Sequence, residues 1–254
     1  MHTICLKDNW TLTVLGKNVY DIPETPIETK VPSTVYGTLL EKGLIPDPFY
    51  RDNELDALKL MENDFAYETT IVISEEDRKA DRLFLHFDGI DTIADVYLNG
   101  EKIGSADNMN RVWEYDITDL VAGDAADTVY QVKVVLHSPT KFIAEEEAKC
   151  PVGAASDAMP GFPHIRKAAC MYGWDWGPRL VTSGIWRPVY LEGWSGARIS
   201  DVFYRQQEVT ARRARVEVEV EIASARDLAE AVVTVASPGE GIEASVTAPL
   251  RSGI

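Results

Sequence analysis

Apolar and polar side chains alternate along short stretches of this sequence, and turn residues separate these stretches. A period of two is typical of a β-strand with one buried face, and Asp88-Gly89 and Asn99-Gly100 are typical turn dipeptides. Few stretches are both long enough and periodic enough for a helix. The sequence therefore predicts a mostly β protein, with strands over residues 10–15, 65–73, 82–87, 93–98, 129–137, 186–192 and 199–204.

Two helices interrupt this pattern. The first is predicted over residues 35–42, because Ser33 or Thr34 can cap its first amides and Gly43 can end it. The second is predicted over residues 141–149. Neither is long enough to change the fold class.

The composition changes near residues 193–198, and the tail that follows has its own pattern. Residues 215–222 alternate without exception, with Val and Ile on one face and Arg and Glu on the other. Two more strands are predicted over 228–236 and 242–246. An immunoglobulin-like sandwich needs about seven strands in roughly 100 residues, so we expect a partial second domain in a chain that is a fragment of a longer protein.

The charge and the apolar runs exclude several classes of partner. The 254 residues carry 25 Lys and Arg against 41 Asp and Glu, a formal charge of −16. Nucleic acid and anionic membranes would repel such a chain, and no run of about 18 apolar residues predicts a membrane span. The start lacks a secretion signal, and Cys5, Cys150 and Cys170 match no disulfide framework. We therefore expect a cytoplasmic protein with reduced thiols and no nucleic-acid or membrane partner.

Most catalytic chemistries lack support in the sequence. The four histidines form no metal-binding motif, so we expect no metal and no other cofactor. His86 and His137 lie in apolar strands and are predicted to be core histidines with satisfied hydrogen bonds. Motifs for nucleotide binding and for serine or cysteine nucleophiles do not occur.

The most distinctive segment is Tyr172-Gly173-Trp174-Asp175-Trp176-Gly177-Pro178-Arg179. Glycan binding needs flat apolar faces for sugar C–H groups and carboxylates for hydroxyls, and tryptophan beside aspartate offers both. In a strand, Asp175 would point away from the two tryptophans. In the loop that glycine and proline favour, all three could line one pocket. The alternative, two core tryptophans and a surface aspartate, stays open.

Several motifs together resemble the N-terminal region of family-2 glycoside hydrolases, specifically the β-mannosidase branch. Residues 31–40, VPSTVYGTLL, and 43–54, GLIPDPFYRDNE, are similar to a β-mannosidase stretch. Residues 87–100 resemble a segment that β-galactosidases and β-glucuronidases share, and residues 108–111 and 184–189 belong to the same shared frame. The sequence IRK at 165–167 followed by GWDWGP at 173–178 favours β-mannosidase.

The resemblance implies a fold, and it places catalysis and part of the sugar binding on different domains. It implies an all-β chain with a jelly-roll, galactose-binding-like β-sandwich over residues 1–196, a partial immunoglobulin-like β-sandwich over 197–254, and a catalytic (β/α)8 barrel that this chain lacks. In such enzymes a retaining mechanism uses two glutamates of the barrel, so no catalytic residue is expected here and the fragment alone should be inactive. Asp175 matches a residue that reaches into the barrel's pocket to bind the terminal sugar, and Trp174 supports it.

The resemblance therefore predicts the non-catalytic part of an exo-acting enzyme for terminal β-mannosides, with this carbohydrate and its own downstream barrel as partners. Homo-oligomer formation stays open. The alternatives are a β-galactosidase or β-glucuronidase of the same family, a stand-alone carbohydrate-binding module, and a purely structural domain. Glycan binding by this segment alone would favour the module.

Overall fold

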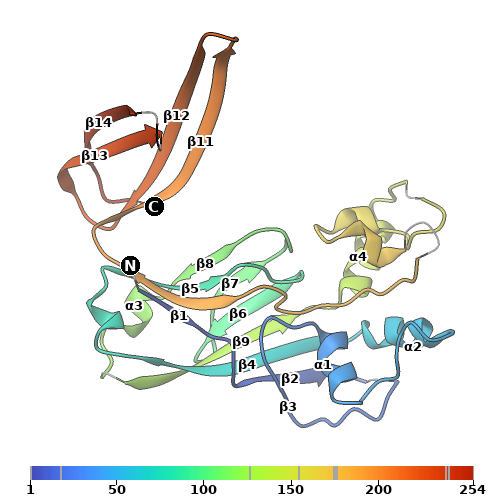
Figure 1. Cartoon of the computed structure of the whole chain (residues 1–254). Helices are drawn as coiled ribbons and strands as arrows, with labels where there is room; N and C mark the ends of the chain where they lie inside the picture. The colour runs from blue at the N-terminus through green and yellow to red at the C-terminus, as the bar shows by residue number, and fades with distance from the viewer. Residues whose placement is uncertain are drawn as a thin grey trace.

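Two antiparallel sheets form a β-sandwich in the computed structural model (Figure 1). The structure describes residues 2–17, 19–125, 127–153, 155–173, 177–237, 239 and 241–253. The larger sheet has the order β3-β2-β4-β9-β6-β7 and the smaller β1-β10-β5-β8. In chain order these strands are β1 (His2–Cys5), β2 (Trp10–Leu15), β3 (Ile27–Thr29), β4 (Asp64–Ile73), β5 (Arg82–Phe87), β6 (Ala94–Leu98), β7 (Glu101–Ala106), β8 (Trp113–Asp116), β9 (Thr128–Leu136) and β10 (Val189–Trp194).

The core lies between the two sheets, because each contributes an apolar face to it. In β9, Val132, Val134 and Leu136 are completely buried, while the residues between them face outward. Leu85 and Phe87 of β5 are equally buried from the opposite sheet. The predicted all-β sandwich is therefore confirmed, and the alternating positions form its core.

The two predicted helices form close to their expected bounds. They are α1 (Val35–Glu41) and α4 (Pro139–Lys149). The side chain of Thr34 accepts the Gly37 amide at 3.1 Å, which decides between the two candidate caps. The sequence did not predict α2 (Asn53–Leu60), α3 (Thr118–Val121) or the short 3-10 turns η1 (Asp77–Lys79), η2 (Phe162–His164) and η3 (Ala169–Tyr172).

One strand begins later than the sequence predicts. The expected strand over 186–192 is β10, which starts at Val189. Pro188 has no amide hydrogen to donate to a sheet, so the ladder with β5 begins only after it. Strands β1, β3, β7 and β8 were not predicted, because they are short and show no sustained alternation.

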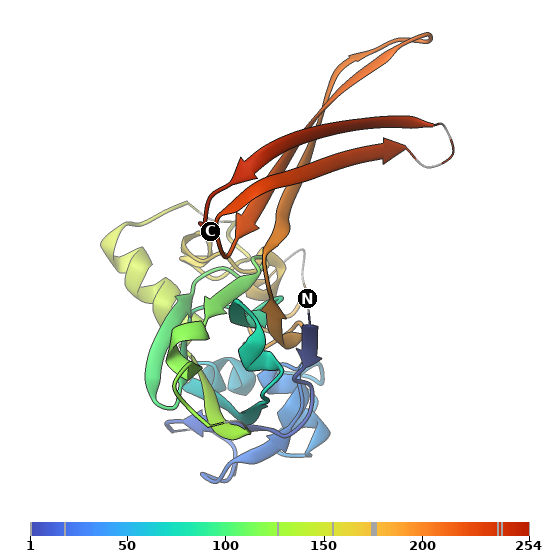
Figure 2. The same cartoon turned by 90° about the vertical axis from the view of Figure 1, so that its left-hand side faces the viewer.

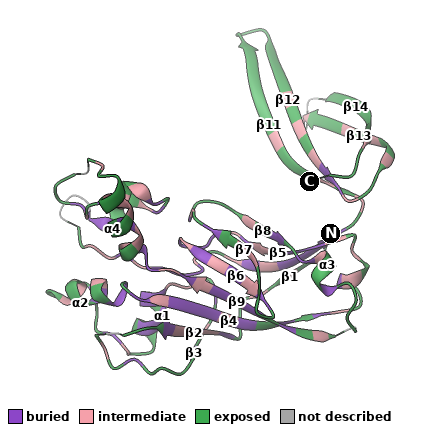
Figure 3. Cartoon of the chain, turned by 180° about the vertical axis from the view of Figure 1, so that it is seen from behind, coloured by how far each residue is buried: buried purple, intermediate pink, exposed green. Residues whose placement is uncertain are grey.

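The tail consists of two antiparallel hairpins that extend away from the sandwich (Figure 2). The first joins β11 (Ala197–Val209) to β12 (Ala214–Ser224), and the second joins β13 (Leu228–Ser237) to β14 (Ile242–Leu250). Figure 3 colours these strands mainly as exposed, in contrast to the purple strands of the sandwich. The main core cluster draws all its fully buried members from residues 10–191.

Two further observations concern the chain as a whole. Among the residues that the structure describes, no helix has the length and apolar character needed to cross a membrane. Cys5, Cys150 and Cys170 are all free and exposed, as the prediction of reduced thiols requires.

Candidate functional site

The segment between α4 and β10 forms a lobe beside the sandwich, with a small core of its own (Figure 1). Ile143 of α4, Ile165, Tyr172 and Val181 are buried together there. Leu58 of α2 and Ile93 of the sandwich pack against this cluster. The lobe is therefore anchored from two sides by apolar contacts.

The predicted sugar-binding residues Trp174 and Asp175, with Trp176, lie outside the described residues. The structure describes the residues on either side of them. Gly173 has a φ of 107°, and a Cβ at this position would come within 2.7 Å of the Asp157 carbonyl oxygen. Only glycine tolerates both conditions, so the sequence requirement for glycine at the start of the motif has a structural cause.

Arg179 fixes the other end of the motif. Its amide donates to Glu54 Oε2 at 3.0 Å, and its guanidinium donates to the Asp157 carbonyl oxygen at 2.9 Å. Glu54 lies on α2, in the segment that the resemblance relates to β-mannosidases. Its carboxylate thus binds a backbone amide across 125 positions of sequence.

A buried ion pair lies at the base of the same segment. Lys167 Nζ bonds to Asp91 Oδ2, and the two side chains are 0% and 1% exposed. Lys167 Nζ also donates to the Thr182 carbonyl oxygen at 2.6 Å. Burial lowers the pKa of Lys167, and the negative charge of Asp91 opposes this shift. Burial and the same carboxylate raise the pKa of the Tyr172 hydroxyl.

His86 does not lie in the core as predicted, because its position in β5 places it on the outer face of the smaller sheet. Its Nε2 is 3.0 Å from Asp88 Oδ1, and its Nδ1 is 3.3 Å from Glu114 Oε1. The hydrogen bond with Glu114 raises the pKa of His86 above its ordinary value of 6.5. The same hydrogen bond lowers the pKa of Glu114 to about 2.

His137 departs from the prediction in the same way. Its side chain is 38% exposed and lies between two carboxylates, Asp64 and Asp95, at 3.2 Å from each. It follows directly after β9, where the strand leaves the apolar layer. An apolar strand therefore did not imply a buried histidine.

His86, Glu114 and Glu192 place three ligand atoms within 4.8 Å of one another, a spacing that suits a metal ion. One cationic side chain already pairs with both glutamates of this group. The Arg198 guanidinium bonds to Glu192 Oε1 and donates to Glu114 Oε1 at 2.8 Å. The guanidinium supplies the positive charge that a metal ion would supply. We therefore infer that this group links the sandwich to β11.

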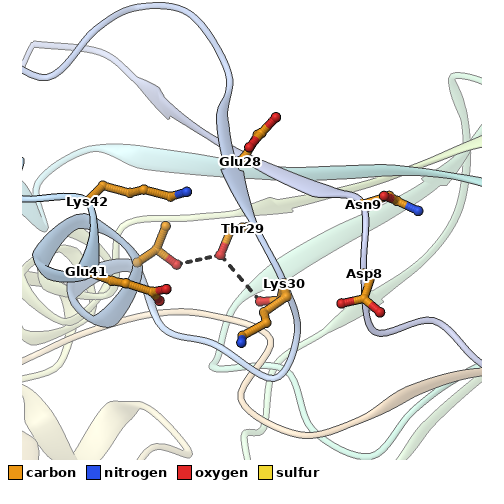
Figure 4. Close-up of a pocket in the computed structure, with 8 residues that line it drawn as sticks. Asp8, Asn9, Glu28, Thr29, Lys30, Glu41 and Lys42 are labelled. Atoms are coloured by element: carbon orange, nitrogen blue, oxygen red, sulfur yellow. Dashed lines mark hydrogen bonds between the residues drawn. The ribbon is translucent and has the colours of Figure 1, made fainter.

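A polar pocket of about 290 Å³ lies between β3 and the C-terminal end of α1. Thr29 Oγ1 shares a hydrogen bond of 2.8 Å with Thr38 Oγ1 inside it (Figure 4). Among its described lining residues there is no aromatic ring on which a sugar could stack. The lining comprises Asp8, Asn9, Glu28, Thr29, Lys30, Thr38, Glu41 and Lys42.

Comparison with known proteins identifies the sandwich. The sequence profile of the family described as "Glycosyl hydrolase 2 galactose-binding domain-like" matches residues 10–187. The chain belongs to this family. The matched region contains the larger sheet, strands β5 and β8 of the smaller sheet and residues 150–187 of the lobe, so the glycosyl hydrolase 2 family resemblance extends over the candidate site.

Curated relatives of this glycosyl hydrolase 2 chain are β-mannosidases. The chain is 32% identical over 201 residues to "Beta-mannosidase" of Bos taurus, covering 76% of this chain and 22% of that protein. It is 32% identical over 200 residues to "Beta-mannosidase B" of Thermothelomyces thermophilus, covering 79% of this chain and 23% of that protein. The chain thus spans less than a quarter of the length of these relatives.

Solved structures agree with the sequence relatives. The β-D-mannosidase from Dictyoglomus thermophilum matches with a TM-score of 0.83 and 32% identity, over 100% of this chain and 30% of that one. The β-glucuronidase from Ruminococcus gnavus matches with a TM-score of 0.60 and 20% identity, over 96% of this chain and 38% of that one. The second likeness shows a shared fold alone.

Sequence reasoning missed the residues that hold the base of the site. Lys167 and Asp91 lay inside quoted motifs but received no role, and neither did the contact between Glu54 and Arg179. No neighbour in sequence signals a role for Lys167, since Ala169 and Cys170 are exposed. Its partner Asp91 is 76 residues distant in sequence, so no local pattern could have joined the two.

Proposed function

We propose that this chain is the non-catalytic N-terminal part of a retaining exo-β-mannosidase, and that it contributes a loop to the sugar pocket of the complete enzyme. The observation that carries the proposal is the agreement of the family profile, the curated β-mannosidase relatives and the β-mannosidase structure. The complete enzyme would hydrolyse terminal β-mannosides, and its hydrolase character follows from the same relatives.

The chemistry divides between this chain and a downstream barrel. Retaining hydrolysis needs an acid/base carboxyl and a nucleophilic carboxylate about 5 to 5.5 Å apart. We place both on the barrel, which is this chain's proposed partner. Carboxylates such as Glu54 and Asp91 are engaged with Arg179 and Lys167 in this chain, which supports a structural use for them.

Asp175 is the residue that we propose for sugar binding, with Trp174 supporting it. An ionised carboxylate accepts hydrogen bonds from sugar hydroxyls, and such charge-assisted bonds are stronger than neutral ones. The described ends of the segment, at Gly173 and Arg179, are held by several hydrogen bonds and a close backbone approach. This support suits a loop that must present a side chain in a defined place.

We also propose a cytoplasmic location, which the three free cysteines favour. The described pocket next to α1 does not support a stand-alone carbohydrate-binding module, since its lining offers charges without an aromatic platform. We therefore retain one candidate function.

The test is a substrate panel with two proteins. The complete polypeptide that contains this chain should hydrolyse an aryl β-mannoside in clear preference to the matching β-galactoside and β-glucuronide. The 254-residue chain should hydrolyse none of them above the uncatalysed rate. Preference for another glycoside would contradict the substrate, and turnover by the chain alone that disappears on mutating one of its own carboxylates would contradict the division of labour.

A further inference from the structure

Residues 167–173 and 177–182, the described residues on either side of Trp174–Trp176, are joined at their outer ends by one side chain. We call residues 167–182 the 167–182 loop. Lys167 Nζ donates to the carbonyl oxygen of Thr182, which lies 15 positions further along the chain. The same atom bonds to Asp91, which lies between β5 and β6 of the sandwich. A single ammonium group therefore joins the start of the loop, its end and the sandwich.

Asp91 also holds the returning arm through its backbone. The Asp91 amide donates to the Gly184 carbonyl oxygen at 2.8 Å, and the Gly184 amide donates to the Asp91 carbonyl oxygen at 3.0 Å. A Cβ at Gly184 would come within 2.4 Å of the Ser33 carbonyl oxygen, so this arm lies tightly against the chain before α1. Asp91 thus contacts the entering arm with its carboxylate and the returning arm with its amide and carbonyl groups.

A completely buried ion pair adds little net stability to a fold. Removing two charges from water costs several kcal/mol per ion, and apolar residues of similar volume often give equal or greater stability. The neighbouring cluster of Ile165, Tyr172 and Val181 shows that apolar packing is available at this place. The pair instead provides a defined geometry, because its hydrogen bonds fix three backbone segments relative to one another.

We propose that Lys167 is a positioning residue, which holds the base of the 167–182 loop so that Asp175 meets the terminal sugar. This inference rests on the function proposed above and names the residue on which the sugar contact depends. Lys167 does not touch the sugar itself. A displacement of about 1 Å at a binding group can cost about 100-fold in rate, so a loosened base should reduce catalysis without any change at the reacting atoms.

The kinetic test uses the complete polypeptide and two variants of the pair. Lys167→Met removes the ammonium group but leaves the Asp91 carboxylate buried without a cationic partner, which strongly destabilises the fold. The double variant Asp91→Asn with Lys167→Met leaves no buried charge and still lacks the bond to Thr182. Lys102→Met is the matched control, because Lys102 pairs with Asp95 at 2.6 Å but is 48% exposed on β7.

We expect the double variant to lower kcat/KM for an aryl β-mannoside about 10-fold or more at temperatures well below its Tm, and Lys102→Met to leave it unchanged. The decisive measurement adds Asp175→Asn to the double variant. Residues that act through one another give non-additive losses. In the double variant, Asp175→Asn should therefore lower kcat/KM by less than about 3-fold. An equal loss on both backgrounds would overturn the inference.

Hydrogen exchange supplies a readout that does not depend on catalysis. In the 254-residue chain, the double variant should speed exchange at the Arg179 amide and along the 167–182 loop, while β4 and β9 stay protected as in the wild type. Unchanged exchange in the loop would overturn the inference. If Asp175→Asn alone leaves β-mannoside hydrolysis intact, the proposed sugar contact fails, and the exchange result still decides whether Lys167 holds the loop.

Discussion

The sandwich and the tail are built from the same kind of alternating strand and differ in what covers them. In β9 of the sandwich, Val132 and Val134 are 0% exposed. In β12 of the tail the alternation is equally regular, yet Val216 is 49% exposed. Alternation therefore determines that a strand forms and which side chains share a face. Whether that face is buried depends on a second layer, which comes from distant parts of the sequence.

The largest expected difference between the two regions is in the free energy lost when a phenylalanine is replaced by alanine. Phe87 of β5 is 0% exposed and Phe203 of β11 is 50% exposed. We expect Phe87→Ala to lower the free energy of unfolding by about 3 to 5 kcal/mol, because it leaves a cavity in the core. Phe203→Ala should cost less than about 1 kcal/mol. Urea unfolding measures both values, and similar losses would show that the tail packs as well as the sandwich.

Backbone protection should follow the same division. Strands β4 and β9 are bonded on both sides within the larger sheet, whereas β13 and β14 pair with each other. Isolated two-stranded hairpins are marginally stable, so amides of β13 and β14 should exchange at least about 100-fold faster than those of β4 and β9. Equal protection in a monomer would remove the distinction between the two regions.

Arg198 of β11 links the two regions through its guanidinium. It bonds to Glu192 and Glu114, and its guanidinium lies 5.3 Å from the centre of the Phe84 ring. Arg198→Lys keeps the charge but loses the planar fork, so we expect a loss of about 1 to 2 kcal/mol in unfolding free energy.

Arg205 in the tail is the control for this substitution. Its side chain is 50% exposed and pairs with Glu217 and Glu219, so Arg205→Lys should cost less than about 0.5 kcal/mol. A larger loss at Arg205 than at Arg198 would mean that the solvent-exposed pairs hold the tail.

The smallest expected effect is the pH dependence of stability that comes from His86 and Glu114, next to Arg198. The pKa of His86 is raised, chiefly by Glu114, so its contribution to stability is complete below pH 6.5 and is lost as the pH rises through the higher folded value. The pKa of Glu114 falls from 4.5 to about 2, so its contribution is complete above pH 4.5 and is lost as the pH falls toward 2. Asp88, Glu192 and Arg198 face the same pair.

The Tm difference between the wild type and His86→Gln should therefore be largest between pH 4.5 and 6.5 and should shrink above this window. Thermal unfolding at pH 5.5 and 8.5 measures it. A difference that grows with pH would reverse the sign assigned to the histidine.

The sequence predicted the parts of the fold that depend on local pattern. Strands such as β2 and β5 have the predicted bounds, and the cap of α1 is Thr34, one of the two residues that the sequence offered for it. Helix α2 escaped prediction because its N-cap, Asp52, makes no side-chain capping bond and its apolar pattern is weak. His86 and His137 were misplaced, since an apolar strand does not reveal which of its faces meets carboxylates.

For the candidate site, the sequence proposed only Trp174 and Asp175, and this stays a prediction. The chemistry of the 173–178 segment allowed a sugar-binding loop or two core tryptophans, and the family resemblance favoured the first. The residues that hold the base of this loop, Lys167 and Asp91, meet only after folding. Long-range ion pairs of this kind have no signature in a single sequence, so their role emerged from geometry.

We propose that Asp175 binds the terminal sugar, and Asp175→Asn in the complete polypeptide is the sharpest test of this contact. The variant keeps the shape of the side chain but removes a charge-assisted acceptor worth about 1.5 to 3 kcal/mol. Glu145→Gln, which changes an exposed carboxylate of α4, is the control. We expect a loss of about 10- to 150-fold in kcat/KM for a β-mannoside with little change in Tm. An unchanged kcat/KM would remove Asp175 from the sugar site.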